Sequence, residues 1–476
     1  MANALTRLLF DPADARADRV PPRHRFTGGQ LSWIAPLGVG AVGVVLFLVL
    51  LLSDPSRALF AYLIAWTFCV SIALGSLFFV MIQHITKARW STTIRRIPEA
   101  LSANFPLLAL AGIPVLLGSY DLFHWTHAEL YDPTSPYYDA LIAGKKAYLN
   151  MPFFVVRYVL YFVAWSWLGH RLYAISVGND TDPDADRTLE LRKVSAYGIP
   201  LAAVTTAFAG FDFLMSTDPH WFSTMFGIYF WAGGWLGALC LITFLALWFK
   251  KMGMLPEVTV EHLQDMGKFM FAFVVFWTYI AFSQYMLYWY ANIPEETVWF
   301  LKRTSFGWGT VAWSLIIFNF ILPFLILLPR ITKRIAPVLA VMAVWLLVMH
   351  WVDLWWVAMP AMEAADEVEE VVAAPPAQGE GGAALIVPAQ AVSGVNDLDG
   401  VLDPDAADAA TPARGETPAD VMDLDVIPPA VPVFEMLVWL GLFGLFLGVT
   451  ILRLRRHALT PYNDPYFAES LRFENV

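Results

Sequence analysis

Charged side chains are scarce in this sequence. They make up 15% of its 476 residues, whereas hydrophobic residues account for 58%. A soluble domain has about a quarter of its residues charged, so the composition excludes an ordinary soluble protein and predicts a polytopic membrane protein. The formal net charge of −11 identifies no partner until it is divided between two sides of a membrane, and we expect no nucleic-acid partner.

Cysteine is almost absent. Cys69 and Cys240 each lie inside an apolar run, without a CxxC or CxxCH motif, and we expect both to be buried as small hydrophobic residues. Two such cysteines cannot hold an iron–sulfur cluster or attach haem covalently. The sequence also lacks a phosphate-binding glycine-rich loop, a zinc HExxH motif and a nucleophile elbow. We therefore predict no metal site and no covalently bound cofactor in this chain.

Long apolar runs are abundant. A bilayer-crossing helix needs about 20 mostly apolar residues, and ten runs meet this length, which predicts an all-α fold with ten transmembrane helices. A cytoplasmic arm at 1–32 precedes nine helices within 33–358, and a tail at 453–476 follows the last one. The runs cover 33–52, 59–82, 104–122, 152–171, 197–215, 224–249, 269–290, 307–328, 337–358 and 432–452.

The distribution of basic residues predicts the orientation of these spans. An even number of spans places both ends of the chain on one side, which then carries 23 of the 30 Lys and Arg residues. The opposite side carries six, and Arg157 lies within a span. Because basic residues gather on the cytoplasmic side, we expect both termini to be cytoplasmic.

One long interruption separates the ninth and tenth runs. Residues 359–431 are rich in Ala, Pro, Gly and acidic residues, with Arg414 as their only basic residue. Such a segment buries too little apolar surface to fold alone. It is either a flexible acidic linker on the outer side or a segment that becomes ordered on an extrinsic partner.

Six ionisable residues lie near the predicted outer ends of the apolar runs. Such groups are costly in a bilayer and usually face a bundle interior or a wet pathway. Residues three apart share a helical face, so each of two carboxylates is expected beside a histidine, where it could accept or relay protons. The arginine is the natural cation for a buried carboxylate. The candidate residues are Asp121, His124, Arg157, Asp212, His350 and Asp353.

These six residues also admit plainer interpretations. Asp121 and Asp212 could lie solvated among lipid headgroups, and His124 could be interfacial. Arg157 and Asp353 lie deeper and are the strongest candidates, although they could form an ion pair that only holds helices together.

Aromatic and small residues give weaker signals. Gln284, Tyr285 and Tyr288 lie in the predicted outer half of the seventh span and are candidate contacts for a quinone. The same aromatic run is typical of an interfacial belt. Gly233 and Gly237 match a small-xxx-small pattern, but glycine is common in membrane helices, so the pattern alone does not predict a helix contact.

Three segments resemble a known family. KAYLNMPFFVVRYVLYF (146–162), FDFLMSTDPHWFSTMFGIYF (211–230) and FSQYMLYWYANIPEETVWF (282–300) resemble the F subunit of bacterial alternative complex III, a quinol:electron-acceptor oxidoreductase. This subunit belongs to the NrfD-like family of polysulfide-reductase membrane subunits. The resemblance covers all ten spans but not the 359–431 insert. It implies two four-helix bundles, at about 59–215 and 224–358, with the first and tenth helices flanking them.

The resemblance also implies a function and partners. The chain would be a subunit of a respiratory complex in the bacterial inner membrane, beside a paralogous NrfD-like subunit, an iron–sulfur protein and c-type haem subunits. It would assist quinol oxidation and proton release or translocation, with menaquinone or another quinone as the candidate ligand. The alternatives are a free-standing proton- or ion-coupled transporter and a purely structural anchor of the complex.

Overall fold

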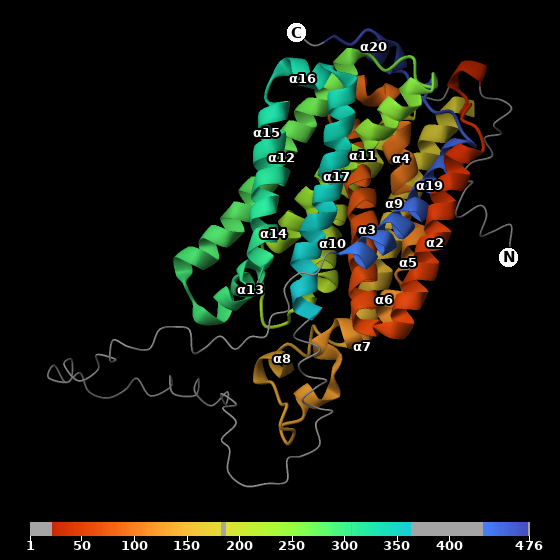
Figure 1. Ribbon diagram of the computed structural model, residues 1–476. Helices are drawn as coiled ribbons and strands as arrows, with labels where there is room; N and C mark the ends of the chain where they lie inside the picture. Colours follow the sequence, from red (N-terminus) through yellow and green to blue (C-terminus); the bar gives the residue numbers. More distant parts are fainter. Residues whose placement is uncertain (1–20, 182–186, 306, 363–431, 475–476) are drawn as a thin grey trace, which may run out of the picture.

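The computed structural model describes residues 21–181, 187–305, 307–362 and 432–474, and within these ranges the chain forms helices and no strand. Ten helical segments in these ranges are long and apolar enough to cross a membrane, as predicted. Most of the predicted acidic insert and of the N-terminal arm lies outside the described residues. Eight of the segments are single helices (Figure 1): α2 (Leu31–Ser53), α3 (Pro55–Ile85), α9 (Met151–Thr181), α10 (Thr188–Phe213), α11 (Phe226–Lys251), α12 (Val260–Ala291), α17 (Ala336–Ala358) and α19 (Val433–Leu454).

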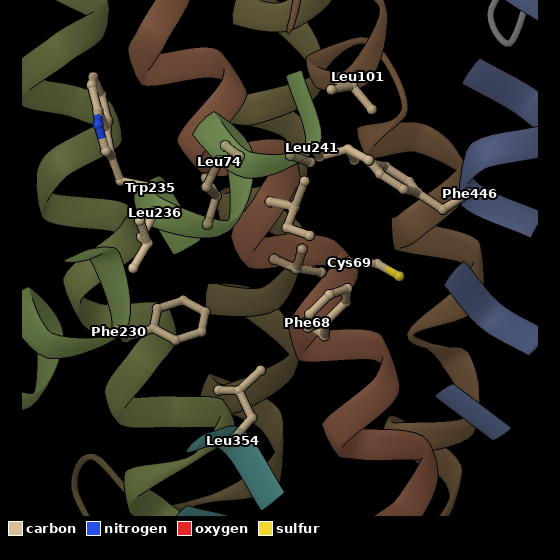
Figure 2. Close-up of a cluster of buried hydrophobic side chains, with 14 of the residues drawn as sticks. Phe68, Cys69, Leu74, Leu101, Phe230, Trp235, Leu236, Leu241, Leu354 and Phe446 are labelled. Atoms are coloured by element: carbon tan, nitrogen blue, oxygen red, sulfur yellow. The ribbon is translucent and has the colours of Figure 1, made fainter. Parts of the chain in front are cut away.

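Helix α3 lies at the centre of the molecule. It packs against α10, α11, α17 and α19, and its apolar stretch is completely buried. Figure 2 shows Phe68 and Leu74 among side chains that include Phe230 and Leu354. Cys69 and the second cysteine are both buried and unbonded, as expected from the sequence.

Glycines bring the central helices close together. A Cβ atom on Gly75 of α3 would lie 2.4 Å from the carbonyl oxygen of Gly234 on α11. The flanking pair α2 and α19 crosses in the same way, because a Cβ on Gly43 would lie 2.2 Å from Cα of Gly441. Small residues allow membrane helices to approach this closely and to gain dispersion contacts.

The third span begins earlier than the sequence predicted. It runs from Arg96 to Leu117 instead of 104–122, and consists of α4 (Arg96–Ser102), α5 (Phe105–Ala111) and α6 (Ile113–Leu117). Prolines at the starts of α5 and α6 interrupt the backbone ladder. Side chains of neighbouring helices bind the carbonyl oxygens there, as membrane helices require. Trp66 Nε1 donates to Leu108 O at 2.8 Å, and the Tyr62 hydroxyl to Ala111 O at 2.6 Å.

The eighth span contains a π-helical segment, Leu315–Ile321, between α14 (Trp308–Ser314) and α15 (Leu322–Leu327). A π-helical bond to the Phe318 carbonyl would come from residue 323, which is a proline without an N–H group. Trp345 of α17 supplies the missing donor, with its Nε1 2.8 Å from Phe318 O.

The molecule has two distinct ends (Figure 1). α16 (Arg330–Arg334) and α20 (Phe467–Leu471) lie at one, here called the α20 end. α8 (Ala140–Gly144) and α13 (Pro294–Thr304) lie at the other, the α8 end. Both ends of the described chain meet at the α20 end, where Leu459 N donates to the carbonyl oxygen of residue 24 at 2.9 Å.

Residues 455–474 form a C-terminal clasp across the α20 end. Asp464 accepts a hydrogen bond from Arg95, which precedes α4, and the Tyr462 hydroxyl donates to Asp180 O at 3.0 Å. Farther along, Ser470 lies 3.4 Å from His262 Nε2 on α12. The clasp therefore connects helices from the first and second halves of the chain.

Candidate functional site

His350 and Asp353 form the buried centre of the candidate site. Both lie on α17, with only 4% and 2% of their surfaces exposed, and both line one pocket. The predicted shared helical face is confirmed. The other residues that line this pocket come mainly from α11 and from the last turn of α17: Leu214, Phe226, Tyr229, Phe230, Gly233, Leu354 and Val357.

Two hydrogen-bond donors hold Asp353. The Tyr229 hydroxyl of α11 donates to its Oδ1, and Trp277 Nε1 of α12 donates to its Oδ2 at 3.2 Å. Within the described parts of the chain, no Lys or Arg forms an ion pair with this carboxylate. A buried carboxylate without a cation has an electrostatic cost that protonation removes. Its surroundings therefore suit a group that binds and releases a proton.

His350 lies in a slot made by glycines. A Cβ on Gly233 would lie 2.9 Å from His350 Cε1, and one on Gly237 would lie 3.1 Å from His350 Cδ2. The imidazole Nε2 is 2.9 Å from the Ser71 hydroxyl of α3. The small-xxx-small pattern of α11 thus makes room for a functional side chain, which sequence spacing alone could not indicate.

Arg157 and Asp212 form a separate buried ion pair between α9 and α10. Arg157 donates from Nε and from one terminal nitrogen to the two Asp212 oxygens, at 2.8 and 2.9 Å, and the Tyr161 hydroxyl donates to Asp212 at 2.7 Å. The guanidinium carbon lies 3.9 Å from the ring centre of Tyr148 and 4.4 Å from that of Phe153. Asp212 is 1% exposed, so its interpretation as a solvated headgroup-level residue is wrong.

Asp121 and His124 do not share a helical face. α7 (Ser119–Leu122) ends before His124, and Phe123 between them is extended, with φ −128° and ψ 100°. The predicted face required a continuous helix, which the chain leaves after Leu122. The six candidate residues therefore do not form one site: Arg157 pairs with Asp212, His350 lies with Asp353, and Asp121 and His124 are each half-buried near the α8 end.

His124 belongs to a polar region at the α8 end. Its ring centre is 5.3 Å from that of His127, and burial lowers the pKa of His124 to about 4. Nearby, His220 Nε2 is 2.5 Å from an Asp139 oxygen, and this hydrogen bond lowers the pKa of Asp139 to about 2. Lys145 Nζ donates to Pro219 O at 2.6 Å. These contacts fasten the loop at 123–150 to the loop at 214–225.

The three candidate quinone contacts do not line the Asp353 pocket. Gln284 is buried and accepts a hydrogen bond from the Ser223 hydroxyl at 3.1 Å, and the Tyr288 hydroxyl donates to a backbone carbonyl. Tyr285 is 43% exposed. As its side chains stand, the pocket is too tight to hold even a water molecule.

The burial of Arg303 was not predicted from the sequence, in which it counts among the basic residues of the outer side. The side chain is only 1% exposed. It lies on α13 and donates to backbone carbonyls, including that of Val357 in the pocket wall. No feature of the local sequence distinguishes it from its neighbour Lys302.

Comparison with known proteins does not show to which family the chain belongs. No protein-family model matches the chain, and no curated protein matches it.

Proposed function

We propose that this protein is an integral membrane subunit of a respiratory quinol:electron-acceptor oxidoreductase, and that it handles protons through Asp353. The observation that carries the proposal is the Asp353 site. This buried carboxylate accepts hydrogen bonds from Tyr229 and Trp277, forms no ion pair within the described residues, and lies one turn from His350. The acceptor would be a c-type cytochrome or another periplasmic electron carrier.

The chemistry of quinol oxidation needs such a group. Removing two electrons from a quinol also releases two protons, and the electrons pass to metal centres in partner subunits. The protons need acceptors that change charge within a low-dielectric environment, which is the usual role of carboxylates and histidines inside membrane proteins. Asp353 would carry the proton, with Tyr229 and Trp277 orienting its carboxylate and His350 as its neighbour in the relay.

The ion pair of Arg157 and Asp212 has a different role in this proposal. Its charges balance, and Tyr161 satisfies a further lone pair of the carboxylate. Breaking such a pair leaves an uncompensated buried charge. We therefore assign it to holding α9 and α10 together, and not to moving protons.

The quinol itself would bind outside the Asp353 pocket, because that pocket does not admit a ring. This chain contributes to proton transfer, and the quinol is held by a partner subunit such as the paralogous NrfD-like chain. We further propose that the α20 end faces the cytoplasm and the α8 end the periplasm, from the split of basic residues. The proposed family architecture is two four-helix bundles, α3 to α10 and α11 to α17, with α2 and α19 beside them.

The transporter alternative is less well supported. Alternating access moves one bundle against the other and usually involves broken helices at the midplane. The C-terminal clasp bonds helices of both halves together through Asp464, Tyr462 and Ser470. Such a connection opposes rocking of one half on the other.

Purification of the tagged chain in mild detergent tests the proposal. We expect it to be isolated with c-type haem, detected by visible absorption, and with an iron–sulfur signal in electron paramagnetic resonance. The isolate should oxidise a quinol analogue when an electron acceptor is supplied. A chain that is isolated alone and transports an ion in liposomes would contradict the proposal.

A further inference from the structure

α13 covers the α8 end of the Asp353 pocket through aromatic contacts. Trp299 of α13 stacks on Trp221, with ring centres 4.2 Å apart and planes at 12°. Trp221 also meets Phe226, which lines the pocket, edge to face at 5.9 Å. α13 is therefore connected through Trp221 to the wall of the candidate site.

Arg303 fastens α13 to the end of α17. Its Nε and one terminal nitrogen donate to Val357 O, at 3.1 and 2.7 Å, and the other terminal nitrogen donates to Trp299 O at 3.0 Å. The attachment is reciprocal, because Trp356 Nε1 of α17 donates to the Arg303 carbonyl oxygen at 2.9 Å. The guanidinium carbon also lies 3.7 Å from the Trp299 ring centre.

The bonded carbonyl belongs to the last turn of α17. The last four carbonyls of a helix have no partner within it, and a cation there also meets the negative end of the helix dipole. Val357 lies four residues after Asp353 and lines the same pocket. The turn that Arg303 holds is therefore the turn next to the carboxylate.

The charge of Arg303 is not balanced by an adjacent carboxylate. Across the described ranges it forms no ion pair within 4 Å, and its hydrogen bonds are to backbone carbonyls. Burial lowers the pKa of Arg303 to about 9, which still leaves it protonated at neutral pH.

From these contacts we infer that Arg303 is a positioning residue for Asp353. It fixes the last turn of α17, which adjoins Asp353, and so holds the carboxylate in reach of its donors Tyr229 and Trp277. The titratable groups that line the pocket with Asp353 are Tyr229 from α11 and His350 from its own helix. This inference rests on the proposed proton-handling function.

The test uses the intact complex in liposomes and measures the rate of quinol-dependent proton release between pH 5 and 9. For Arg303→Gln, we expect the acid limb of the profile to move up by about one pH unit, which is tenfold in proton concentration and is the order expected when a carboxylate loses a hydrogen bond from a displaced donor. Arg303→Lys keeps the charge but cannot form the two-pronged bond to Val357, so it should move the profile in the same direction.

Hydrogen exchange gives a second readout that does not depend on the function. Backbone amides of 356–361 should exchange faster in both variants, whereas Lys302→Gln on the same helix should alter neither exchange nor rate. If Arg303→Gln does not assemble, Arg303→Lys decides by the same two readouts. Unchanged exchange in Arg303→Lys would overturn the inference.

Asp353→Asn separates the two claims. If this variant slows proton release while Arg303→Gln leaves the pH profile and the exchange unchanged, the inference about Arg303 is wrong and the proposed function stands. If Asp353→Asn changes nothing in an assembled complex, the proposed function fails, and the inference fails with it.

Discussion

Asp212 accepts two hydrogen bonds from Arg157 and a third from Tyr161, so its negative charge is balanced within the fold. Among the described residues, the donors to Asp353 are a phenol and an indole. Both carboxylates are buried, but only the first is paired with a cation among the described residues, so a proton can bind to the second without leaving a cation unpaired. The side chains bonded to each carboxylate, a cation for Asp212 and neutral donors for Asp353, therefore distinguish the candidate for proton transfer.

The ion pair leads to a stability prediction at the scale of single residues. Arg157→Gln should lower the free energy of unfolding in detergent by about 3–5 kcal/mol, because Asp212 would remain buried without its cation. The double variant with Asp212→Asn should cost less than the sum of the two single changes, since the partners are coupled.

An exposed ion pair provides the control for this measurement. Arg171 and Glu190 have side chains that are 52% and 41% exposed. Arg171→Gln should therefore cost less than about 1 kcal/mol. Equal losses in the Arg157 and Arg171 variants would contradict the account of the buried pair.

At the scale of elements, α11 shows how backbone approach creates a site. Gly234 faces the backbone of Ser71 on α3, while Gly233 and Gly237 face the imidazole of His350. One glycine-rich stretch therefore sets the distance between α3 and α11 and leaves the space that His350 occupies.

Adding a methyl group at Gly233 should crowd the imidazole of His350. Gly233→Ala would place a carbon 2.9 Å from His350, so overpacking should cost about 1–3 kcal/mol of unfolding free energy, measured by thermal denaturation in detergent. Gly38→Ala on α2 is the matched control, because nothing lies within 4 Å of its added carbon. Alanine favours a helix over glycine, so the control should be neutral or slightly stabilising. Destabilisation of both variants alike would argue against a specific slot.

The sequence predicted helices better than it predicted contacts between them. Apolar runs of about 20 residues identify spans because a helix needs this apolar length to cross the bilayer. All ten predicted spans correspond to helical segments of the described residues. The start of the third span was missed because Arg96 and Glu99 are charged, yet both are buried in ion pairs. The pairing of Arg157 with Asp212 joins two helices, and residue spacing within one helix carries no information about it. The burial of Arg303 was likewise invisible in its local sequence.

At the scale of the whole molecule, the C-terminal clasp joins the helices at the α20 end. His24 packs against the clasp: its imidazole is 2.8 Å from the Thr460 hydroxyl and stacks on Tyr462 with ring centres 5.0 Å apart. Burial lowers the pKa of His24 to about 4, and burial also lowers the pKa of His457 to about 3. Both histidines are therefore neutral in the folded clasp at neutral pH.

Acid should loosen the clasp. Between pH 6.5 and about 4, an unfolded chain binds a proton at His24 that the folded chain does not, so stability falls as the pH falls through this window. Hydrogen exchange of residues 459–470, corrected for the intrinsic effect of pH, should therefore be faster at pH 4.5 than at pH 7. His24→Gln should reduce this difference, with His457 accounting for the remainder. A clasp whose exchange shows no such pH dependence would contradict this account.

Asp353 is proposed to carry protons during quinol oxidation. The direct measurement is the rate of quinol-dependent proton release by the purified complex in liposomes, with Asp353→Asn compared with the exposed loop variant Asp132→Asn at equal amounts of assembled complex. We expect Asp353→Asn to slow proton release by at least about tenfold, because a positioned acid–base group is lost. Asp132→Asn should release protons at the rate of the unmodified complex. An unchanged rate in assembled Asp353→Asn would contradict the account and would leave this chain the role of a structural anchor.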